Sequence, residues 1–246
     1  MRRTQTWHSP RLQRDMSVAC WGHFGKPVLL FPTAGGDFLE CERFLMVRAL
    51  RGLIDAGRIK LYACGSVSRE SWMDKGAAPA HKSWLQGRFD AYLREELCPF
   101  ILDDCGGGNP GLIAAGASLG AYNAVNASTK HPDVFDGAIA MSGTYFFDRW
   151  MHGHWDENYY FNMPVQFIPR MGPGREIERL RQRFFLLASG TGRWEAPDET
   201  AALARIMEGQ GIPHHLELWG EDADHDWPTW RTMLPMFLDR VLTRLG

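Results

Sequence analysis

The chain has 246 residues, of which 45% are hydrophobic and 23% are charged, as in ordinary soluble globular proteins. Its 27 basic and 29 acidic side chains nearly balance, which excludes partners selected by bulk charge, such as nucleic acid. No apolar run follows the basic start of the chain, and none approaches the roughly 18 residues of a membrane span, so we expect a cytoplasmic protein that does not bind membranes.

Strand-like and helix-like segments alternate along the chain, which is typical of a mostly parallel sheet with helices on both faces. The predicted strands are residues 27–33, 59–64, 111–117, 136–142, 184–189 and 214–219. The predicted helices are residues 42–55, 80–102, 120–130, 197–211 and 227–245. Pro132 ends the third helix, since proline cannot continue a helix interior, and Asp198 is expected to cap the fourth.

Residues 145–183 interrupt this alternation and are rich in aromatic side chains. We expect this aromatic segment to leave the sheet and form a cap or insertion. Its rings would form either the core of the cap or an apolar wall of a substrate pocket, and the sequence leaves both roles open. Since no repeat or linker marks a second domain, residues 1–246 are expected to form a single α/β domain.

The stretch GASLGAYNA (residues 116–124) places Ser118 between Gly116 and Gly120, directly after a predicted strand and before a predicted helix. The glycines allow the backbone to turn tightly, so the serine hydroxyl would stand at the carboxyl end of the strand, where α/β sheets place their sites. The same pattern arises by chance in a glycine-rich chain, where it is a plain turn. The residues that follow Ser118 in the chain favour a catalytic nucleophile.

Acyl transfer through a serine needs a histidine as base and a carboxylate that orients the histidine. His225 lies between the last predicted strand and the last predicted helix, in a loop that can reach the carboxyl edge of the sheet. Glu195 follows the strand at 184–189, which gives the chain order serine, acid, histidine of the α/β-hydrolases. The acid remains open between Glu195 and three other carboxylates, Asp148, Asp198 and Asp222.

A metal site is the rival chemistry. The stretch HGHWDE (residues 152–157) contains the pattern His-x-His-x-Asp, which can bind zinc. It lies inside the aromatic segment and lacks a further histidine after Asp156, so we interpret it as a polar loop and expect no metal and no cofactor. The five cysteines form no C-x-x-C pair, which favours reduced thiols over a disulfide framework or a zinc site.

Several stretches together resemble a known family: FPTAGGDF (31–38), RESW (69–72), GASLGAYNA, AMSGTY (140–145) and HDWPTW (225–230). The sequence resembles the α/β-hydrolase superfamily and, within it, the putative esterase family that includes feruloyl esterases, S-formylglutathione hydrolases and mycolyltransferases. The resemblance implies an α/β-hydrolase fold with a mostly parallel, eight-stranded sheet. Its N-terminal portion would be antiparallel, and TQTWHSP and MSVACW are the candidate strands.

The resemblance also implies an oxyanion hole and a set of substrate contacts. One oxyanion N–H would come from Leu119, and the second from Gly35 or, alternatively, Ala34. Thr33-Ala34 stands where the family has a His-Gly pair, which leaves the second donor open. The residues expected to contact substrate are Glu70, Trp72 and Tyr145, although Glu70 and Trp72 could equally hold their own loop in place.

The predicted function is hydrolysis of a small or medium carboxylic ester, through an acyl-enzyme formed by a Ser-His-acid triad. Two alternatives remain open. An acyltransferase would pass the acyl group to another alcohol or thiol, and a non-catalytic binding protein would use the hydrolase scaffold alone. Substrate identity does not follow from the sequence, because a fold does not fix a function.

Overall fold

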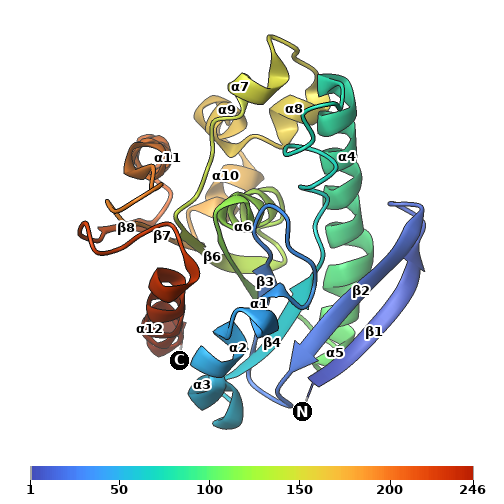
Figure 1. The fold of residues 1–246 in the computed structure, drawn as a ribbon, viewed down its shortest axis with the longest axis vertical. Helices are drawn as coiled ribbons and strands as arrows, with labels where there is room; N and C mark the ends of the chain where they lie inside the picture. The colour runs from blue at the N-terminus through green and yellow to red at the C-terminus, as the bar shows by residue number, and fades with distance from the viewer. Residues whose placement is uncertain (1, 246) are drawn as a thin grey trace.

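Residues 2–245, which the structure describes, form in this computed structural model an eight-stranded sheet with helices on both faces (Figure 1). The strands are β1 Arg2–Ser9, β2 Arg14–Trp21, β3 Lys26–Phe31, β4 Ile59–Cys64, β5 Leu112–Ala117, β6 Phe135–Met141, β7 Phe184–Ser189 and β8 His214–Leu218. Their order is β1-β2-β4-β3-β5-β6-β7-β8, with antiparallel pairing from β1 to β4 and parallel pairing from β4 to β8. The predicted sheet, with its antiparallel N-terminal portion, is confirmed.

Helices fill the connections between the strands. They are α1 Glu40–Arg43, α2 Met46–Ala49, α3 Arg51–Asp55, α4 Pro79–Tyr92, α5 Cys98–Asp104, α6 Leu119–Lys130, α7 Asp148–Met151, α8 Glu157–Phe161, α9 Pro164–Phe167, α10 Arg175–Leu180, α11 Pro197–Gly209 and α12 Trp227–Leu245. A π-helical turn, Leu93–Leu97, joins α4 to α5. No helix in the described part of the chain is long and apolar enough to cross a membrane.

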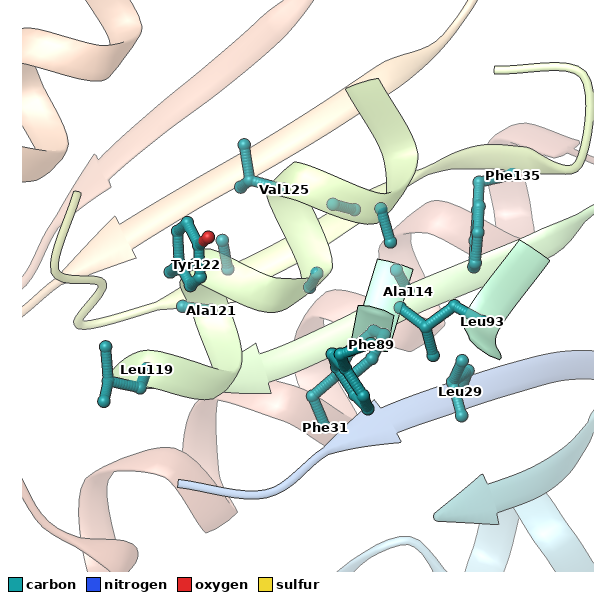
Figure 2. Packing of buried hydrophobic residues seen from close by; sticks show 14 of the residues in the cluster. Leu29, Phe31, Phe89, Leu93, Ala114, Leu119, Ala121, Tyr122, Val125 and Phe135 are labelled. Carbon is teal, nitrogen blue, oxygen red and sulfur yellow. The ribbon is translucent and has the colours of Figure 1, made fainter. Parts of the chain in front are cut away.

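Two hydrophobic clusters lie on opposite faces of the sheet. Residues of α4, α5, α6, α10 and α11 belong to one cluster, and residues of α1 to α3 and α12 belong to the other. Figure 2 shows part of the first, where Phe31 of β3 lies beside Phe89 of α4 and Tyr122 comes from α6. Because helices cover both faces, β4 and β5 are buried along their whole length, and their sequences are continuous apolar runs.

Two predicted helical details are wrong. The predicted helix at 42–55 is divided into α1, α2 and α3. Leu45, with a left-handed φ of 64°, separates α1 from α2, and Leu50, with a φ of −86° and a ψ of 0°, separates α2 from α3. Asp198 does not cap α11, whose N-cap residue is Ala196. Asp198 instead lies in the first turn, where a carboxylate interacts favourably with the helix dipole.

The aromatic segment, residues 145–183, lies between β6 and β7 and contains α7 to α10. Figure 1 shows α7, α8 and α9 gathered at the top of the view, near the upper end of α4. Ser83 of α4 donates a hydrogen bond of 2.7 Å to Asp156, which caps α8. Tyr145, Phe147 and Tyr159 are buried in the hydrophobic cluster of α4 and α6, so part of the aromatic content of this segment joins the main core.

Candidate active site

Ser118 forms a strained turn between β5 and α6. It has a φ of 58° and a ψ of −125°, in a region that side chains other than glycine rarely adopt. Its N–H donates a 3.0 Å hydrogen bond to the carbonyl of Met141, the last residue of β6. The side chain is half-buried at the carboxyl edge of the sheet. This geometry presents a hydroxyl as a nucleophile elbow does.

Gly116 and Gly120 are the residues that make this turn possible. A Cβ at Gly116 would lie 2.3 Å from the carbonyl carbon and oxygen of Gly120. A Cβ at Gly120 would lie 2.6 Å from the carbonyl oxygen of Pro32 and 2.7 Å from that of Phe31. Helix α6 therefore packs directly on the end of β3, which brings the loop after β3 close to Ser118.

Replacing Gly120 with alanine is expected to lower the free energy of unfolding by about 1 to 3 kcal/mol, the usual cost of overpacking. The new methyl group would meet backbone oxygens, which cannot move away as a flexible side chain can. Gly52→Ala in α3 is the matched control, because a Cβ there meets nothing within 4 Å. Chemical denaturation of both variants measures the difference, and equal stabilities would contradict the packing described here.

The loop after β3 holds the candidate oxyanion donors. An N–H in the first turn of a helix has no partner within that helix, and Leu119 is in this position in α6. Across from it, Ala34 and Gly35 lie in a turn closed by a 3.2 Å hydrogen bond from the N–H of Gly36 to the carbonyl of Thr33. An N–H after the serine and one from the loop after β3 are the two donors that an α/β-hydrolase oxyanion hole requires.

A buried carboxylate holds this loop, and the sequence analysis did not identify it. Glu40 accepts hydrogen bonds of 2.7 Å from both the N–H and the hydroxyl of Thr33. A Cβ at Gly36 would lie 2.3 Å from the same carboxyl group, so the loop can approach it only with glycine there. Burial raises the pKa of Glu40 above its usual value, although the bonds from Thr33 oppose the rise.

Glu195 lies beyond the end of β7, and its carboxylate is fully buried. It accepts a 2.6 Å hydrogen bond from the hydroxyl of Ser142 and a 3.0 Å hydrogen bond from the hydroxyl of Ser189. The indole N–H of Trp230 donates to the oxygen of Ser142 at 2.9 Å. These contacts fix the carboxylate in one orientation.

His225 lies against this carboxylate. Its Nδ1 is 3.6 Å from Oε2 of Glu195, and this nitrogen is buried without a hydrogen-bond partner. The distance is within the range of an ion pair but beyond that of a hydrogen bond. Catalytic hydrogen bonds are often this long without substrate and shorten when it binds. The ring of Trp230 packs edge-on against the imidazole, with centroids 5.1 Å apart, and limits where it can turn.

The loops after β7 and β8 pack closely against each other, and this packing brings Glu195 and His225 together. A Cβ at Gly190 would lie 1.9 Å from the carbonyl oxygen of Ala223, so the two loops touch through their backbones. The N–H of His225 donates to the carbonyl of Arg193 at 3.0 Å. The guanidinium of Arg193 in turn binds the carboxylate of Asp224 through two nitrogens, and this pairing lowers the pKa of Asp224.

Ser118 is connected to Glu195 and His225 through the backbone at the end of β6, and within residues 2–245 no hydrogen bond joins its hydroxyl to the imidazole. Ser118 is bonded to the end of β6 at Met141, and the next residue, Ser142, binds Glu195. Glu195 in turn lies against His225. The structure thus brings Glu195 and His225 into contact, at the edge of the sheet where the Ser118 turn also lies.

The other predicted acids have different surroundings. Within residues 2–245, Glu195 is the carboxylate that lies within 4.0 Å of the imidazole of His225. Asp148 accepts a hydrogen bond from the hydroxyl of Tyr159 in the aromatic segment, and Asp198 lies in the first turn of α11. Asp222 is exposed in the loop after β8. The geometry favours Glu195 among these candidates.

The residues expected to contact substrate are separated by the fold. Glu70 is exposed and forms a 2.9 Å ion pair with Arg14. Trp72 is buried, and its indole N–H donates to Gln86. Tyr145 is also fully buried. The side chains of Trp72 and Tyr145 are therefore not accessible to a substrate in this structure, and their place is in the core.

The stretch HGHWDE has a structural role. His154 lies 2.8 Å from a carboxylate oxygen of Asp156, and the other oxygen accepts a hydrogen bond from the N–H of Tyr159 at the start of α8. In the described part of the chain, no group of three or more histidine, cysteine, aspartate or glutamate side chains is arranged to hold a metal ion. Asp156 thus acts as a helix cap in a polar loop.

Comparisons with known proteins bear on this arrangement. A model of the family described as putative esterase matches residues 64–240. A search of curated proteins gave no match. A ferulic acid esterase structure superposes with a TM-score of 0.75 at 18% identity, covering 100% of this chain and 98% of its own. An S-formylglutathione hydrolase from Agrobacterium tumefaciens gives 0.77 at 14% identity, with coverage of 100% and 96%.

A third similar solved structure is that of a serine hydrolase. FphF, a fluorophosphonate-binding serine hydrolase of Staphylococcus aureus, superposes with a TM-score of 0.71 at 12% identity. The match covers 98% of this chain and 98% of that one. At these identities the likeness is one of fold, and the predicted α/β-hydrolase fold is confirmed.

Proposed function

The chain belongs to the putative esterase family, and from that premise we propose that it hydrolyses small or medium carboxylic esters through an acyl-enzyme on Ser118. The observation that supports the proposal is the strained Ser118 turn at the same sheet edge as the buried Glu195 and His225, which contact each other. The partner is a small-molecule ester. We also propose a cytoplasmic location, in keeping with cysteines that are free thiols.

In the first half-reaction the hydroxyl oxygen of Ser118 attacks the ester carbonyl carbon while the imidazole of His225 accepts the hydroxyl proton. The tetrahedral intermediate collapses when the bond to the alcohol oxygen breaks, and His225 gives its proton to the leaving alcohol. Water then attacks the acyl-enzyme with His225 again as the base. The acid is released, and the proton returns to Ser118.

Two groups of residues lower the barrier of these steps. Glu195 holds the imidazole in place and stabilises the imidazolium that forms when it accepts a proton. The N–H groups of Leu119 and of Gly35 or Ala34 bind the developing oxyanion, and each such donor typically contributes about 3 kcal/mol. Glu40 holds the loop that carries the second donor, through its bonds to Thr33.

Pre-steady-state hydrolysis of 4-nitrophenyl butyrate tests the proposal. If acylation is faster than deacylation, we expect a burst of nitrophenolate equal to the concentration of enzyme, followed by slower turnover. An added alcohol or thiol that captures the acyl group in place of water would identify an acyltransferase. A folded protein that releases no nitrophenolate above the uncatalysed rate would contradict both and favour a non-catalytic binding protein.

A further inference from the structure

A polar groove lies on the far side of the candidate oxyanion loop from His225. It has a volume of about 460 Å³ and is bounded by the loop after β3, the loop after β4 and the start of β2. Gly35 and Gly36 form one wall, and Arg69 and Glu70 form another. Because Gly35 is also a candidate oxyanion donor, the groove begins where the ester carbonyl would bind.

The groove contains charges of both signs, but most of them are already paired. Glu70 forms a 2.9 Å ion pair with Arg14, and Asp37 forms a 2.8 Å ion pair with Arg43. Asp15 lies 3.2 Å from a ring nitrogen of His8. The acidic side chains of the groove thus each have a basic neighbour.

Arg69 is different. Its guanidinium is exposed, and it donates a 3.3 Å hydrogen bond from Nη2 to the carbonyl oxygen of Gly35. No carboxylate among residues 2–245 lies within 4.0 Å of it. A guanidinium has five N–H donors in a planar fork that matches a carboxylate. Arg69 therefore has donors left for an anionic group of a ligand beside the oxyanion loop.

The order of the strands decides which part of the ester reaches Arg69. His225 follows β8 and must contact the leaving oxygen, so the alcohol portion lies on the β6 to β8 side of Ser118. The groove lies on the opposite side, over β3, β4 and β2. The acyl portion projects away from the leaving group, and it can extend past the loop after β3 toward the groove.

We propose that the preferred substrates are esters whose acyl group ends in a carboxylate, and that Arg69 binds that carboxylate. This inference rests on the proposed esterase function and adds to it the charge of the acyl group. An ester of a dicarboxylic acid has the required chemistry: one carboxyl group is the ester that Ser118 attacks, and the other is the free anion.

Two substrates of equal chain length test the inference: 4-nitrophenyl hydrogen adipate, which is anionic, and 4-nitrophenyl hexanoate, which is neutral. We expect wild-type kcat/KM for the adipate to exceed that for the hexanoate by about tenfold, after correction for spontaneous hydrolysis. Arg69→Gln should abolish this preference, and Arg69→Lys should restore part of it. Added salt should weaken the preference, because the site is exposed.

Kinetics with the neutral ester distinguish binding of the substrate carboxylate by Arg69 from an effect of Arg69 on the position of the oxyanion loop. Arg69 also binds the carbonyl of Gly35, so a loss on both esters in Arg69→Gln reports on the oxyanion loop, whereas a change in their ratio reports on the carboxylate. Arg48→Gln, an exposed arginine of α2 outside the groove, is the control and should leave the ratio unchanged. Wild-type enzyme that prefers the hexanoate, or a ratio that Arg69→Gln does not change, would overturn the inference.

Failure of the esterase proposal would look different, since neither ester would be hydrolysed. Binding of adipic acid monoanilide, an amide that the enzyme need not cleave, then tests the groove by calorimetry. Binding to the wild type that is lost in Arg69→Gln would support the anion site. Absence of binding to the wild type would overturn it.

Discussion

Replacing Ser118 with alanine is expected to lower kcat for ester hydrolysis by about 10⁶-fold, as loss of a serine nucleophile does in other triads. The acyl-enzyme cannot form without the hydroxyl, and the burst of nitrophenolate should disappear with it. Binding should change little, because the oxyanion donors and the groove remain. Steady-state kinetics with a 4-nitrophenyl ester, in parallel with thermal unfolding, measures both parts of the effect.

Ser128→Ala is the matched control for that variant. Ser128 lies on the same helix, α6, and its hydroxyl donates to the carbonyl of Gly137 at 3.1 Å. Its loss should cost about 1 kcal/mol of stability and leave kcat unchanged. Turnover by Ser118→Ala close to that of Ser128→Ala would show that Ser118 is not the nucleophile.

Replacing Glu195 with glutamine is expected to lower kcat by about 10⁴-fold without destabilising the fold. An amide has the size of the carboxylate and can still accept a hydrogen bond from Ser142 or Ser189. It cannot stabilise the imidazolium that forms on His225. It also removes a buried charge whose hydrogen bonds come from neutral hydroxyls, so the melting temperature should not fall.

Asp224→Asn supplies the comparison, because Asp224 adjoins His225 in sequence but pairs with Arg193. We expect kcat of this variant to fall by tenfold or less. Loss of the ion pair would loosen only the contact between the loops that carry Arg193 and Asp224, and an exposed ion pair contributes little to stability. A loss as large as that of Glu195→Gln would indicate that the catalytic acid had been assigned to the wrong carboxylate.

The central strands of the sheet could be predicted from the sequence because they are buried on both faces. Runs such as IKLYAC at 59–64 and LIAAGA at 112–117 are apolar at nearly every position, and the turn residues around them mark their ends. The break at Leu45 could not be predicted in the same way. Nothing in its side chain requires a positive φ, and the conformation depends on how α1 and α2 pack against the sheet.

Sequence could predict the site residues whose place depends on which strand they follow. Ser118, Glu195 and His225 follow the parallel strands β5, β7 and β8, so their place in the chain puts them at one edge of the sheet. Ser142, Ser189 and Trp230 surround Glu195 by contacts across the sheet, which no local pattern reveals. The motifs AMSGTY and HDWPTW, which contain Ser142 and Trp230, are the signal that could have identified two of them.

Covalent labelling of Ser118 tests its role as the nucleophile without reliance on any chosen substrate. The folded protein would be treated with a fluorophosphonate, digested, and mapped by mass spectrometry, with Ser118→Ala treated in parallel. If Ser118 is the nucleophile, a single adduct will be found on the peptide that contains Ser118, and none in the alanine variant. A folded wild-type protein that remains unlabelled, or an adduct on any other residue, would contradict this role of Ser118.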